Sequence, residues 1–256
     1  MSLHMDWMFD VSKRAVEKTT GALWPYRSIV SNRPAGGDAC LTAEDFKTLS
    51  FISGPICNRC GSPQEFLTDD DLTCSSCLAR EPAWQRARAA LVYDDSSARP
   101  ILALKRAGRR DGLATMARWM RRAADDVLTD ADIITAVPLH RSRLASRGYN
   151  QAIWLGAALG RCSGVPFQTA ILHRKRNTPS QGGLSARARK RNVSGAFDVG
   201  LKQRERIQDK RVVLVDDVLT TGATVAACAS ALCRAGASAV DIVTVARVVH
   251  EQDATI

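Results

Sequence analysis

The sequence lacks a long hydrophobic run and an N-terminal targeting signal. No apolar segment approaches the roughly 20 residues that a membrane-spanning helix requires. Residues 1–10 contain Asp6 and Asp10 around Trp7 and Phe9, without the cationic and then apolar order of a secretory signal peptide. We therefore expect a cytoplasmic protein that does not insert into membranes.

The chain also lacks the G-x-x-x-x-G-K-[ST] loop of P-loop nucleotide-binding proteins. This absence matters because an apolar run, residues 212–215, is followed at once by Asp216 and Asp217. The run is typical of a strand buried on both faces of a parallel sheet. Without the loop, the two carboxylates are not expected to be the magnesium-holding strand of such a protein.

Acidic residues are absent from residues 133–197, and aromatic residues make up only 5% of the chain. The remainder has 25 basic and 26 acidic residues, so the net charge of +10 arises wholly within this stretch. A strongly positive surface suits a polyanion such as a pyrophosphate compound or a nucleic acid. The alternative is a solvated face with scattered arginines. The basic residues of the stretch are Arg141, Arg143, Arg147, Arg161, Arg174, Lys175, Arg176, Arg187, Arg189, Lys190 and Arg191.

Four of the eight cysteines have metal-ligand spacing. Cys57, Cys60, Cys74 and Cys77 form C-x2-C-x13-C-x2-C, the spacing of two knuckles that close on one tetrahedral zinc. Four thiolate ligands leave no open coordination position, so we expect a structural zinc. Two disulfides are the alternative, which a chain without a secretion signal disfavours.

The residues after the buried run form a strand, an acidic pair, a hydroxyl-rich turn and a helix. The turn and the start of the helix would direct backbone N–H groups and hydroxyls at an anion such as a phosphate. Asp216 and Asp217 are acceptors suited to the hydroxyls of a sugar. A phosphate site and a diol site one turn apart indicate a ribose 5-phosphate. The phosphate-binding residues of this hypothesis are Thr220, Thr221, Gly222, Ala223 and Thr224.

Strand and helix patterns alternate from residue 87 onward, which predicts an α/β fold with a parallel sheet flanked by helices. The predicted strands are residues 90–93 and 133–137, and the predicted helices are residues 100–106, 112–128 and 149–160, the last capped by Asn150 or its neighbour. The turn after the second strand, with Leu139, His140, Arg141 and Arg143, offers amides and guanidinium groups to an anion. A lone histidine beside a turn is more often structural than catalytic.

Residues 171–197 place polar and glycine residues between two basic clusters. Such a loop can close over a phosphorylated ligand while its cations neutralise the leaving group. We assign this neutralising role to Arg174 and Lys175, and the loop itself to Gln181, Arg189 and Arg191. A disordered linker is the alternative, because the segment has few apolar residues to bury.

The motif of type I phosphoribosyltransferases that binds 5-phosphoribosyl 1-pyrophosphate (PRPP) resembles residues 212–224, which read Val-Val-Leu-Val-Asp-Asp-Val-Leu-Thr-Thr-Gly-Ala-Thr. The chain from about residue 24 to residue 249 resembles the ComF family, which joins N-terminal zinc ribbons to such a domain. The motifs that carry this resemblance are residues 57–61, 137–140, 147–152, 178–184, 191–193 and 212–224.

The resemblance implies a role for each of these motifs. Leu139, His140 and Arg141 correspond to a pyrophosphate loop, Asp216 and Asp217 contact the ribose hydroxyls, and residues 220–224 take the 5-phosphate. Mg²⁺ would bridge pyrophosphate and ribose oxygens. The implied organisation is an N-terminal segment at residues 1–50, a zinc ribbon at 51–86 and a phosphoribosyltransferase domain at 87–256.

The chain departs from the family at its N-terminus. Many relatives carry a further C-x2-C, whereas Cys40 is followed three residues later by Ala43, and Ser28 and Ser31 stand where another pair is expected. We interpret residues 1–50 as containing a degenerate first ribbon that has lost its metal.

Two functions of different classes follow. The first is an enzyme that transfers phosphoribose between PRPP with Mg²⁺ and a nitrogen acceptor that the sequence does not identify. The second is a non-catalytic competence-type accessory protein that binds single-stranded DNA or a DNA-uptake protein, with PRPP as an effector or a vestige. The intact acidic pair favours the first, and the low aromatic content weakens base-stacking recognition in the second.

Overall fold

The computed structural model of the chain describes residues 26–35, 40–64, 72–176, 191, 193 and 195–249. The chain folds as two compact units, Met1–Leu49 and Ser50–Ile256. None of the helices in the described part of the chain has the length and apolar character needed to span a lipid bilayer.

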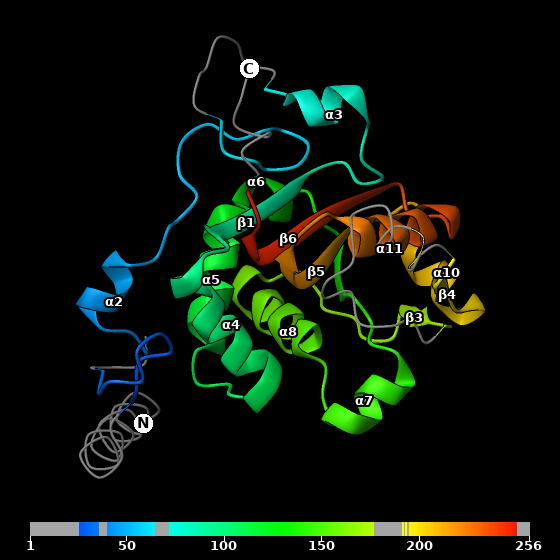
Figure 1. Ribbon diagram of the computed structural model, residues 1–256. Coiled ribbons are helices and arrows are strands. Elements are labelled where there is room, and N and C mark those ends of the chain that lie inside the picture. The colour runs from blue at the N-terminus through cyan, green and yellow to red at the C-terminus, as the bar shows by residue number, and fades with distance from the viewer. Residues whose placement is uncertain are drawn as a thin grey trace, which may run out of the picture. The chain divides into compact units, whose positions relative to one another are not determined.

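The larger unit is built on a four-stranded parallel sheet (Figure 1). Its strands, in spatial order, are β1 (Ala87–Val92), β6 (Ala239–Arg247), β5 (Arg211–Leu219) and β2 (Ile133–Ala136), and each neighbouring pair is parallel. β5 is an inner strand whose first apolar residues are buried on both faces, as the sequence predicts. The α/β fold class is therefore confirmed.

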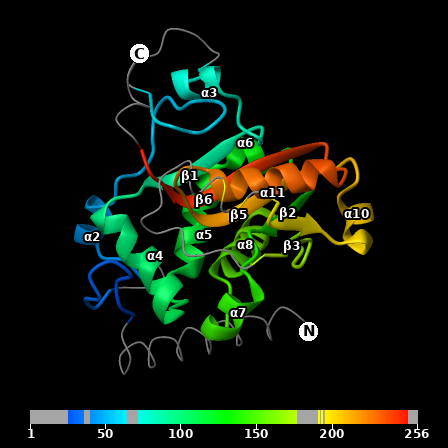
Figure 2. The same ribbon diagram turned by 45° about the vertical axis from the view of Figure 1, so that its right-hand side comes forward.

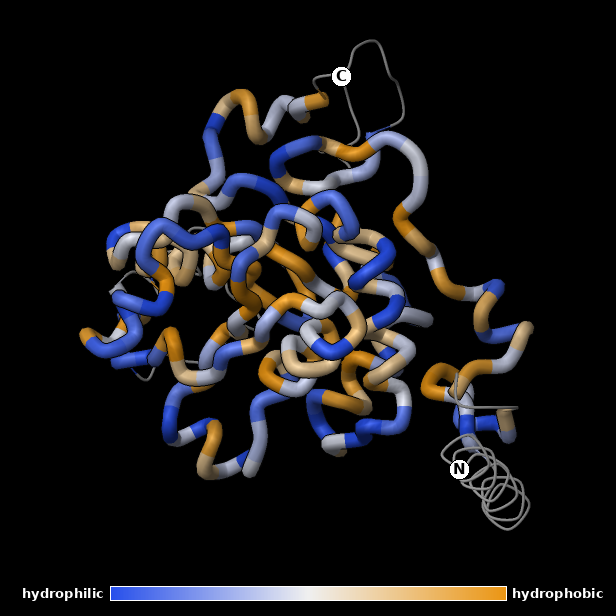
Figure 3. The backbone as a smooth tube through the Cα atoms, turned by 180° about the vertical axis from the view of Figure 1, so that it is seen from behind, coloured by the Kyte–Doolittle hydropathy of each residue, from blue (hydrophilic) through white to orange (hydrophobic). Residues whose placement is uncertain are grey.

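Helices cover both faces of this sheet (Figures 1 and 2). α5 (Leu113–Ala123) and α8 (Gln151–Ser163) pack together on one face, and α11 (Ala223–Arg234) packs on the other face. A small antiparallel pair, β3 (Leu172–Arg174) and β4 (Phe197–Val199), joins the α11 side. The hydrophobic segments run through the central strands (Figure 3), so the core is sandwiched between two helical layers.

The remaining helices of the described residues are short or peripheral. They are α2 (Ala43–Lys47), α3 (Ser75–Ala79), α4 (Asp95–Ala107), α6 (Asp125–Leu128), α7 (Arg141–Arg147) and α10 (Leu201–Ile207).

Several predicted boundaries are wrong. α4 begins at Asp95 rather than at residue 100, because Asp94 and Ser97 form a reciprocal capping box ahead of Pro100. The helix predicted over residues 112–128 is broken at Ala124, whose φ of −119° ends α5. This break turns Asp126 toward Arg88, with which it forms an ion pair at 2.8 Å.

Two predictions beside the expected ligand site also need correction. β5 does not end before the acidic pair but continues through it to Leu219, and Asp216 pairs in register with Thr244 of β6. The turn predicted over residues 139–143 is instead the start of α7, which begins at Arg141. β6 is absent from the predicted elements, although its apolar run carries the same signal as β5.

The smaller unit contains a knuckle-like turn built from hydroxyl groups. The buried Ser28 hydroxyl oxygen accepts the N–H groups of Val30 at 3.1 Å and Ser31 at 3.4 Å. The Ser31 hydroxyl donates to the Asp45 carboxylate at 2.6 Å. Although burial raises the pKa of Asp45, hydrogen bonds from Ser28, Ser31 and Thr42 outweigh it and leave this pKa below its usual value. The turn is therefore closed by hydrogen bonds.

The four predicted zinc ligands converge in the larger unit. The sulfur atoms of Cys57, Cys60, Cys74 and Cys77 all lie within 4.8 Å of one another, and those of Cys60 and Cys74 are 3.7 Å apart. Sulfurs placed about 2.3 Å from a tetrahedral zinc are about 3.8 Å apart, so the cluster fits this ion. In the described part of the chain, this is the one group of three or more His, Cys, Asp or Glu side chains that could hold a metal ion.

The surroundings of Cys57 favour its thiolate form. The Cys60 thiol and the N–H groups of Cys60 and Cys74, at 3.5 and 3.4 Å, lower the pKa of Cys57 to about 4. Burial raises the pKa of Cys77 to about 12, with the charge of Cys57 adding to the effect. Zinc binds thiolates, so a divalent cation would release the protons that the cluster still holds.

We predict one zinc per chain in the purified protein. Cys74→Ser removes a buried ligand, and we expect this variant to lose zinc and the order of the turns at residues 57–60 and 74–77 while the sheet stays folded. Cys162→Ser, at a cysteine outside the cluster, is the matched control and should keep its zinc. Elemental analysis and circular dichroism measure both effects. Two zinc ions per chain would contradict the interpretation of residues 1–50 as a metal-free ribbon.

Candidate functional site

The predicted phosphate loop connects β5 to α11 at the carboxyl end of the sheet. Thr220 and Thr221 are exposed, and Gly222 has a φ of +72°, a conformation that glycine adopts without strain. Gly222 is the N-cap of α11, and no side chain caps this helix. The amides of the first turn are thus directed toward the exposed threonines, an arrangement that favours an anion.

The acidic pair is held asymmetrically. Asp217 is buried, and its Oδ2 accepts hydrogen bonds from Lys105 Nζ and Gln151 Nε2, both at 3.0 Å. Asp216 is half-buried, and its Oδ1 accepts the N–H of Asp217 at 2.9 Å. Consecutive residues of a strand point to opposite faces, so the two carboxylates have different surroundings. Asp217 is neutralised by the protein, whereas Asp216 has no comparable ion pair among the described contacts.

This asymmetry appears in the protonation of the pair. Burial and the neighbouring charge of Asp217 raise the pKa of Asp216 to about 7, against an opposing effect of Lys105. Burial lowers the pKa of Lys105, but the two carboxylates outweigh it and leave this pKa above its usual value. Lys105 is thus a cation at neutral pH, while Asp216 is poised between its protonated and ionised forms.

The second predicted anion turn lies at the end of β2, the strand next to β5. The Asn150 side chain donates to the Val137 carbonyl at 3.0 Å and accepts the N–H of Ala152, so it holds the turn and caps α8. This confirms the predicted cap. The His140 ring nitrogen accepts the N–H of Ser142 at 3.2 Å and caps α7, the structural role that the sequence favours.

Arginine and glutamine side chains connect this turn to the acidic pair. Arg147 donates to Gln151 Oε1 at 2.9 Å, and Gln151 in turn donates to Asp217. Arg141, at the first position of α7, is exposed.

The two basic residues expected to neutralise a leaving group are separated. Arg174 is buried at the end of β3 and interacts electrostatically with Asp216. Burial and the charge of Arg143 lower the pKa of Arg174. Lys175 is exposed and forms an ion pair at 2.5 Å with Asp198 of β4, so in this structure it is engaged within the β3–β4 pair.

The structure describes only one of the three predicted loop residues. Gln181 and Arg189 lie outside the described residues, and Arg191 is exposed. The predicted closure of this loop over a ligand therefore stays a prediction.

Lys105 and Gln151 are site residues that sequence reasoning missed. Lys105 lies in the last turn of α4, 112 positions before its carboxylate partner, and no local pattern distinguishes it from a solvated helix lysine. Gln151 belongs to a motif that carries the family resemblance, but its hydrogen bond to Asp217 is not visible in that motif.

Comparisons with known proteins identify the family of the chain. Residues 149–255 match the family model described as phosphoribosyl transferase domain. The chain is 36% identical over 194 residues to "DNA utilization protein YhgH" of Escherichia coli (strain K12), covering 73% of this chain and 82% of that protein. It is 32% identical over 200 residues to "Competence protein F" of Haemophilus influenzae, covering 76% and 86% respectively.

Solved structures give a weaker likeness. A structure described as the allosteric regulatory enzyme of purine biosynthesis is 22% identical with a TM-score of 0.35, and the match covers 52% of this chain and 26% of that one. The two curated relatives match over most of their length at more than 30% identity. The chain therefore belongs to the ComF family of phosphoribosyltransferase-like proteins.

Proposed function

We propose that the chain binds PRPP with Mg²⁺ and transfers phosphoribose to a nitrogen acceptor. The observation that carries this proposal is the position of Asp216 one turn before the uncapped N-terminus of α11, with Lys105 and Arg174 close to it. An acceptor for sugar hydroxyls and an anion site follow one another along a single strand-to-helix connection, the arrangement that the diol and the 5-phosphate of one ribose would need. The phosphoribosyl transferase domain match spans both.

Each part of the site has a role in this proposal. The amides and hydroxyls of residues 220–224 would bind the 5-phosphate, and ionised Asp216 would accept hydrogen bonds from the ribose hydroxyls. Asp217 has its negative charge already paired by Lys105, so it would contribute its remaining acceptor capacity without adding an uncompensated charge. The site of the pyrophosphate would be lined by Leu139, His140 and Arg141.

In the transfer, the bond from the ribose C1 to the pyrophosphate oxygen breaks, and pyrophosphate leaves with the electron pair. The acceptor nitrogen then forms the new bond to C1. Mg²⁺ would supply charge neutralisation of the pyrophosphate and ribose oxygens. Arg174, a buried cation near Asp216, is placed to stabilise negative charge that develops on the leaving group. The chain would thus act by alignment and electrostatic stabilisation.

Asp216→Asn tests the proposal. The exchange keeps the side-chain size but removes a charge-assisted hydrogen bond worth roughly 1.5–3 kcal/mol, so the affinity for PRPP with Mg²⁺ should fall about tenfold or more. Asp125→Asn, an equal change of charge at an exposed residue of α6, is the matched control and should leave this affinity unchanged. Isothermal titration calorimetry measures both. Equal PRPP affinity for the wild type and Asp216→Asn would refute the site.

We also predict that PRPP affinity rises with pH. Binding through ionised Asp216, with a pKa of about 7, should be about tenfold weaker at pH 6 than at pH 8, because the competent fraction is smaller. In Asp216→Asn, the part of the pH dependence that comes from residue 216 should disappear. The part that comes from protonation of the ligand phosphates should remain, because it is common to the wild type and the variant. A pH dependence that is the same in both would contradict the prediction.

Unfolding would not explain weaker binding at pH 6. The pKa of Asp216 in the folded chain lies above its unfolded value of 3.8, so its protonated form stabilises the fold at low pH, and this contribution is lost as pH rises through about 7. The contribution of Asp216 to stability therefore changes in the direction opposite to PRPP affinity.

A second candidate function is the binding of single-stranded DNA. It is favoured by the names of the two relatives and by the stretch without acidic residues, which presents exposed Arg141, Arg176 and Arg191. Base stacking has little support in this stretch, because Tyr149 stacks on Trp154 at 4.4 Å and Arg110 covers the Trp154 ring at 3.7 Å. DNA would therefore be held chiefly through its phosphates.

A thymidine oligonucleotide separates the two functions. Asp216→Asn should leave its affinity unchanged or slightly higher while PRPP affinity falls, since removing a carboxylate from a basic surface favours a polyanion. Phosphate contacts should also give a salt dependence of roughly −0.7 in log affinity against log salt for each neutralised phosphate. Fluorescence anisotropy at several salt concentrations measures this, and the absence of oligonucleotide binding at low salt would exclude the DNA function.

A further inference from the structure

An aromatic ring lies against the phosphate loop at its most constrained residue. A Cβ atom added to Gly222 would be 2.6 Å from Cη2 and 3.2 Å from Cζ3 of Trp84. Gly222 therefore combines a positive φ with a contact that no larger residue can make. Trp84 is half-buried and also packs against the core beside Ala223 and Ala227 of α11. The six-membered ring of Trp84 forms a wall of the loop that begins α11.

The opposite edge of the same side chain is fixed to the four-cysteine cluster. Trp84 Nε1 donates to the carbonyl oxygen of Arg59 at 3.1 Å, and the N–H of Ala87 donates to the same oxygen at 2.9 Å. Arg59 lies between the ligands Cys57 and Cys60. A single side chain thus joins a turn whose shape depends on the cluster to the loop that would bind the 5-phosphate.

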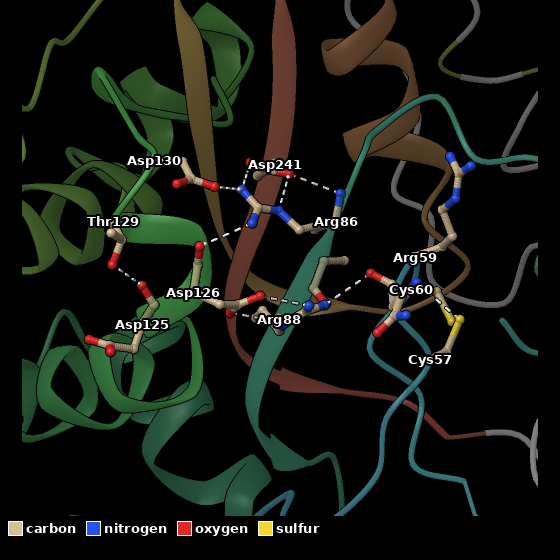
Figure 4. A network of polar contacts seen from close by, with 12 residues as sticks. Cys57, Arg59, Cys60, Arg86, Arg88, Asp125, Asp126, Thr129, Asp130 and Asp241 are labelled. Carbon is tan, nitrogen blue, oxygen red and sulfur yellow. Dashed lines mark hydrogen bonds and ion pairs between the residues drawn. The ribbon is translucent and has the colours of Figure 1, made fainter. Parts of the chain in front are cut away.

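The turn between the two ligands is docked on the sheet through three consecutive carbonyl groups. Figure 4 shows one of these contacts, in which Arg88 of β1 lies between this turn and Asp126 of α6. Arg88 Nη1 of β1 donates to Asn58 O at 3.2 Å, Trp84 and Ala87 donate to Arg59 O, and Arg247 Nη1 of β6 donates to Cys60 O at 2.5 Å. Arg247 pairs in register with Leu219, the last residue of β5 before the loop. Arg247 and the loop therefore lie at the same end of the sheet, whereas Ala87 and Arg88, which hold the other two carbonyl groups, lie at the start of β1.

The backbone around Trp84 leaves little freedom for independent movement. The N–H of Gln85 donates to Val240 O at 2.8 Å, and the Arg86 side chain forms an ion pair with buried Asp241 at 3.0 Å. With its backbone attached to β6, the indole can change its position chiefly by rotation of its side chain. The hydrogen bond to Arg59 opposes that rotation.

We propose that Trp84 is a positioning residue that couples the metal state of the four-cysteine cluster to ligand binding at the phosphate loop. This inference rests on the proposed function, since it concerns the affinity of the same loop for the 5-phosphate of PRPP. Without a metal, the turn at residues 58–60 loses the two ligand bonds at its ends and keeps only its hydrogen bonds, so the position of the Arg59 carbonyl is less firmly fixed. The Trp84 ring is then free to rotate, and a smaller fraction of molecules has the loop in its binding conformation.

The test compares PRPP affinity in zinc-loaded and chelator-treated protein by isothermal titration calorimetry with Mg²⁺ present. Removal of zinc should weaken PRPP binding to the wild type about fivefold or more, the lower end of common coupling between two sites. Trp84→Phe keeps an aromatic side chain at this position but loses the N–H that reaches Arg59 and the outer ring that approaches Gly222. It should retain its zinc, bind PRPP more weakly than the wild type, and show no further loss on chelation.

Trp119→Phe is the matched control. Trp119 packs edge-on against Phe51 at 5.4 Å between ring centroids and makes no described contact with the phosphate loop. This variant should keep both the PRPP affinity and the zinc dependence of the wild type. Thermal melting shows whether the two tryptophan variants are equally stable, so that a general loss of structure is distinguished from a loss of positioning.

The outcomes separate the two proposals. If the zinc-loaded wild type does not bind PRPP, the proposed function is wrong and the present inference is wrong with it. If the wild type binds PRPP and Trp84→Phe binds it equally well with zinc present, only the role of Trp84 is refuted. If Trp84→Phe retains the full effect of chelation, the coupling does not pass through Trp84. The zinc-loaded comparison remains decisive even where chelation unfolds the chain.

Discussion

The structure of the site depends on the need to balance two adjacent carboxylates on a buried strand. Like charges this close oppose ionisation, and burial increases the cost. Lys105 and Gln151 resolve this for Asp217, and they come from α4 and α8, two helices that follow different strands. Because Asp217 is the paired carboxylate, burial and the repulsion from Asp217 act on Asp216 and raise its pKa to about 7. The last turn of α4 brings Lys105 to Asp217, and the first residue of α8 brings Gln151 to it. The asymmetry of the pair thus follows from the positions of these two helix ends.

Positive charges also lie close together around the acidic pair. Burial and the charge of Arg143 lower the pKa of Arg174, so the charged form of Arg174 is disfavoured by a neighbouring arginine. An anion placed between the β2 turn and the α11 loop would relieve this repulsion, whereas Asp216 alone, half-protonated near neutral pH, relieves little of it. The site therefore combines an excess of positive charge with an acceptor for hydroxyl groups, which is the chemistry of a phosphorylated sugar.

The sequence predicts those parts of this arrangement that arise from local patterns. The buried run of β5, the Asn150 cap and the convergence of four cysteines each follow from short spacings, and the structure shows them. Contacts between distant segments have no such signal. The pairing of Lys105 with Asp217 and the approach of Trp84 to Gly222 join residues more than one hundred positions apart, and both depend on how the crossover connections place the ends of helices and loops. The extension of β5 through the acidic pair was missed for a related reason, since it requires Thr244 on β6 as a partner.

Two turns in the chain are closed by similar hydrogen bonds, and one of them also carries cysteines that could hold a metal. Cys57 Sγ accepts the N–H groups of Cys60 and Cys74, and in the smaller unit Ser28 Oγ accepts those of Val30 and Ser31. The sulfur turn gathers four cysteine side chains, and a cation would displace the protons that they still hold. The serine turn instead directs its hydroxyl groups at the Asp45 carboxylate, whose lowered pKa shows that the charge is satisfied without a metal. A hydroxyl group both accepts from the backbone and donates to a carboxylate, so exchanging cysteine for serine can keep a knuckle closed once an acidic residue replaces the ion as the central charge.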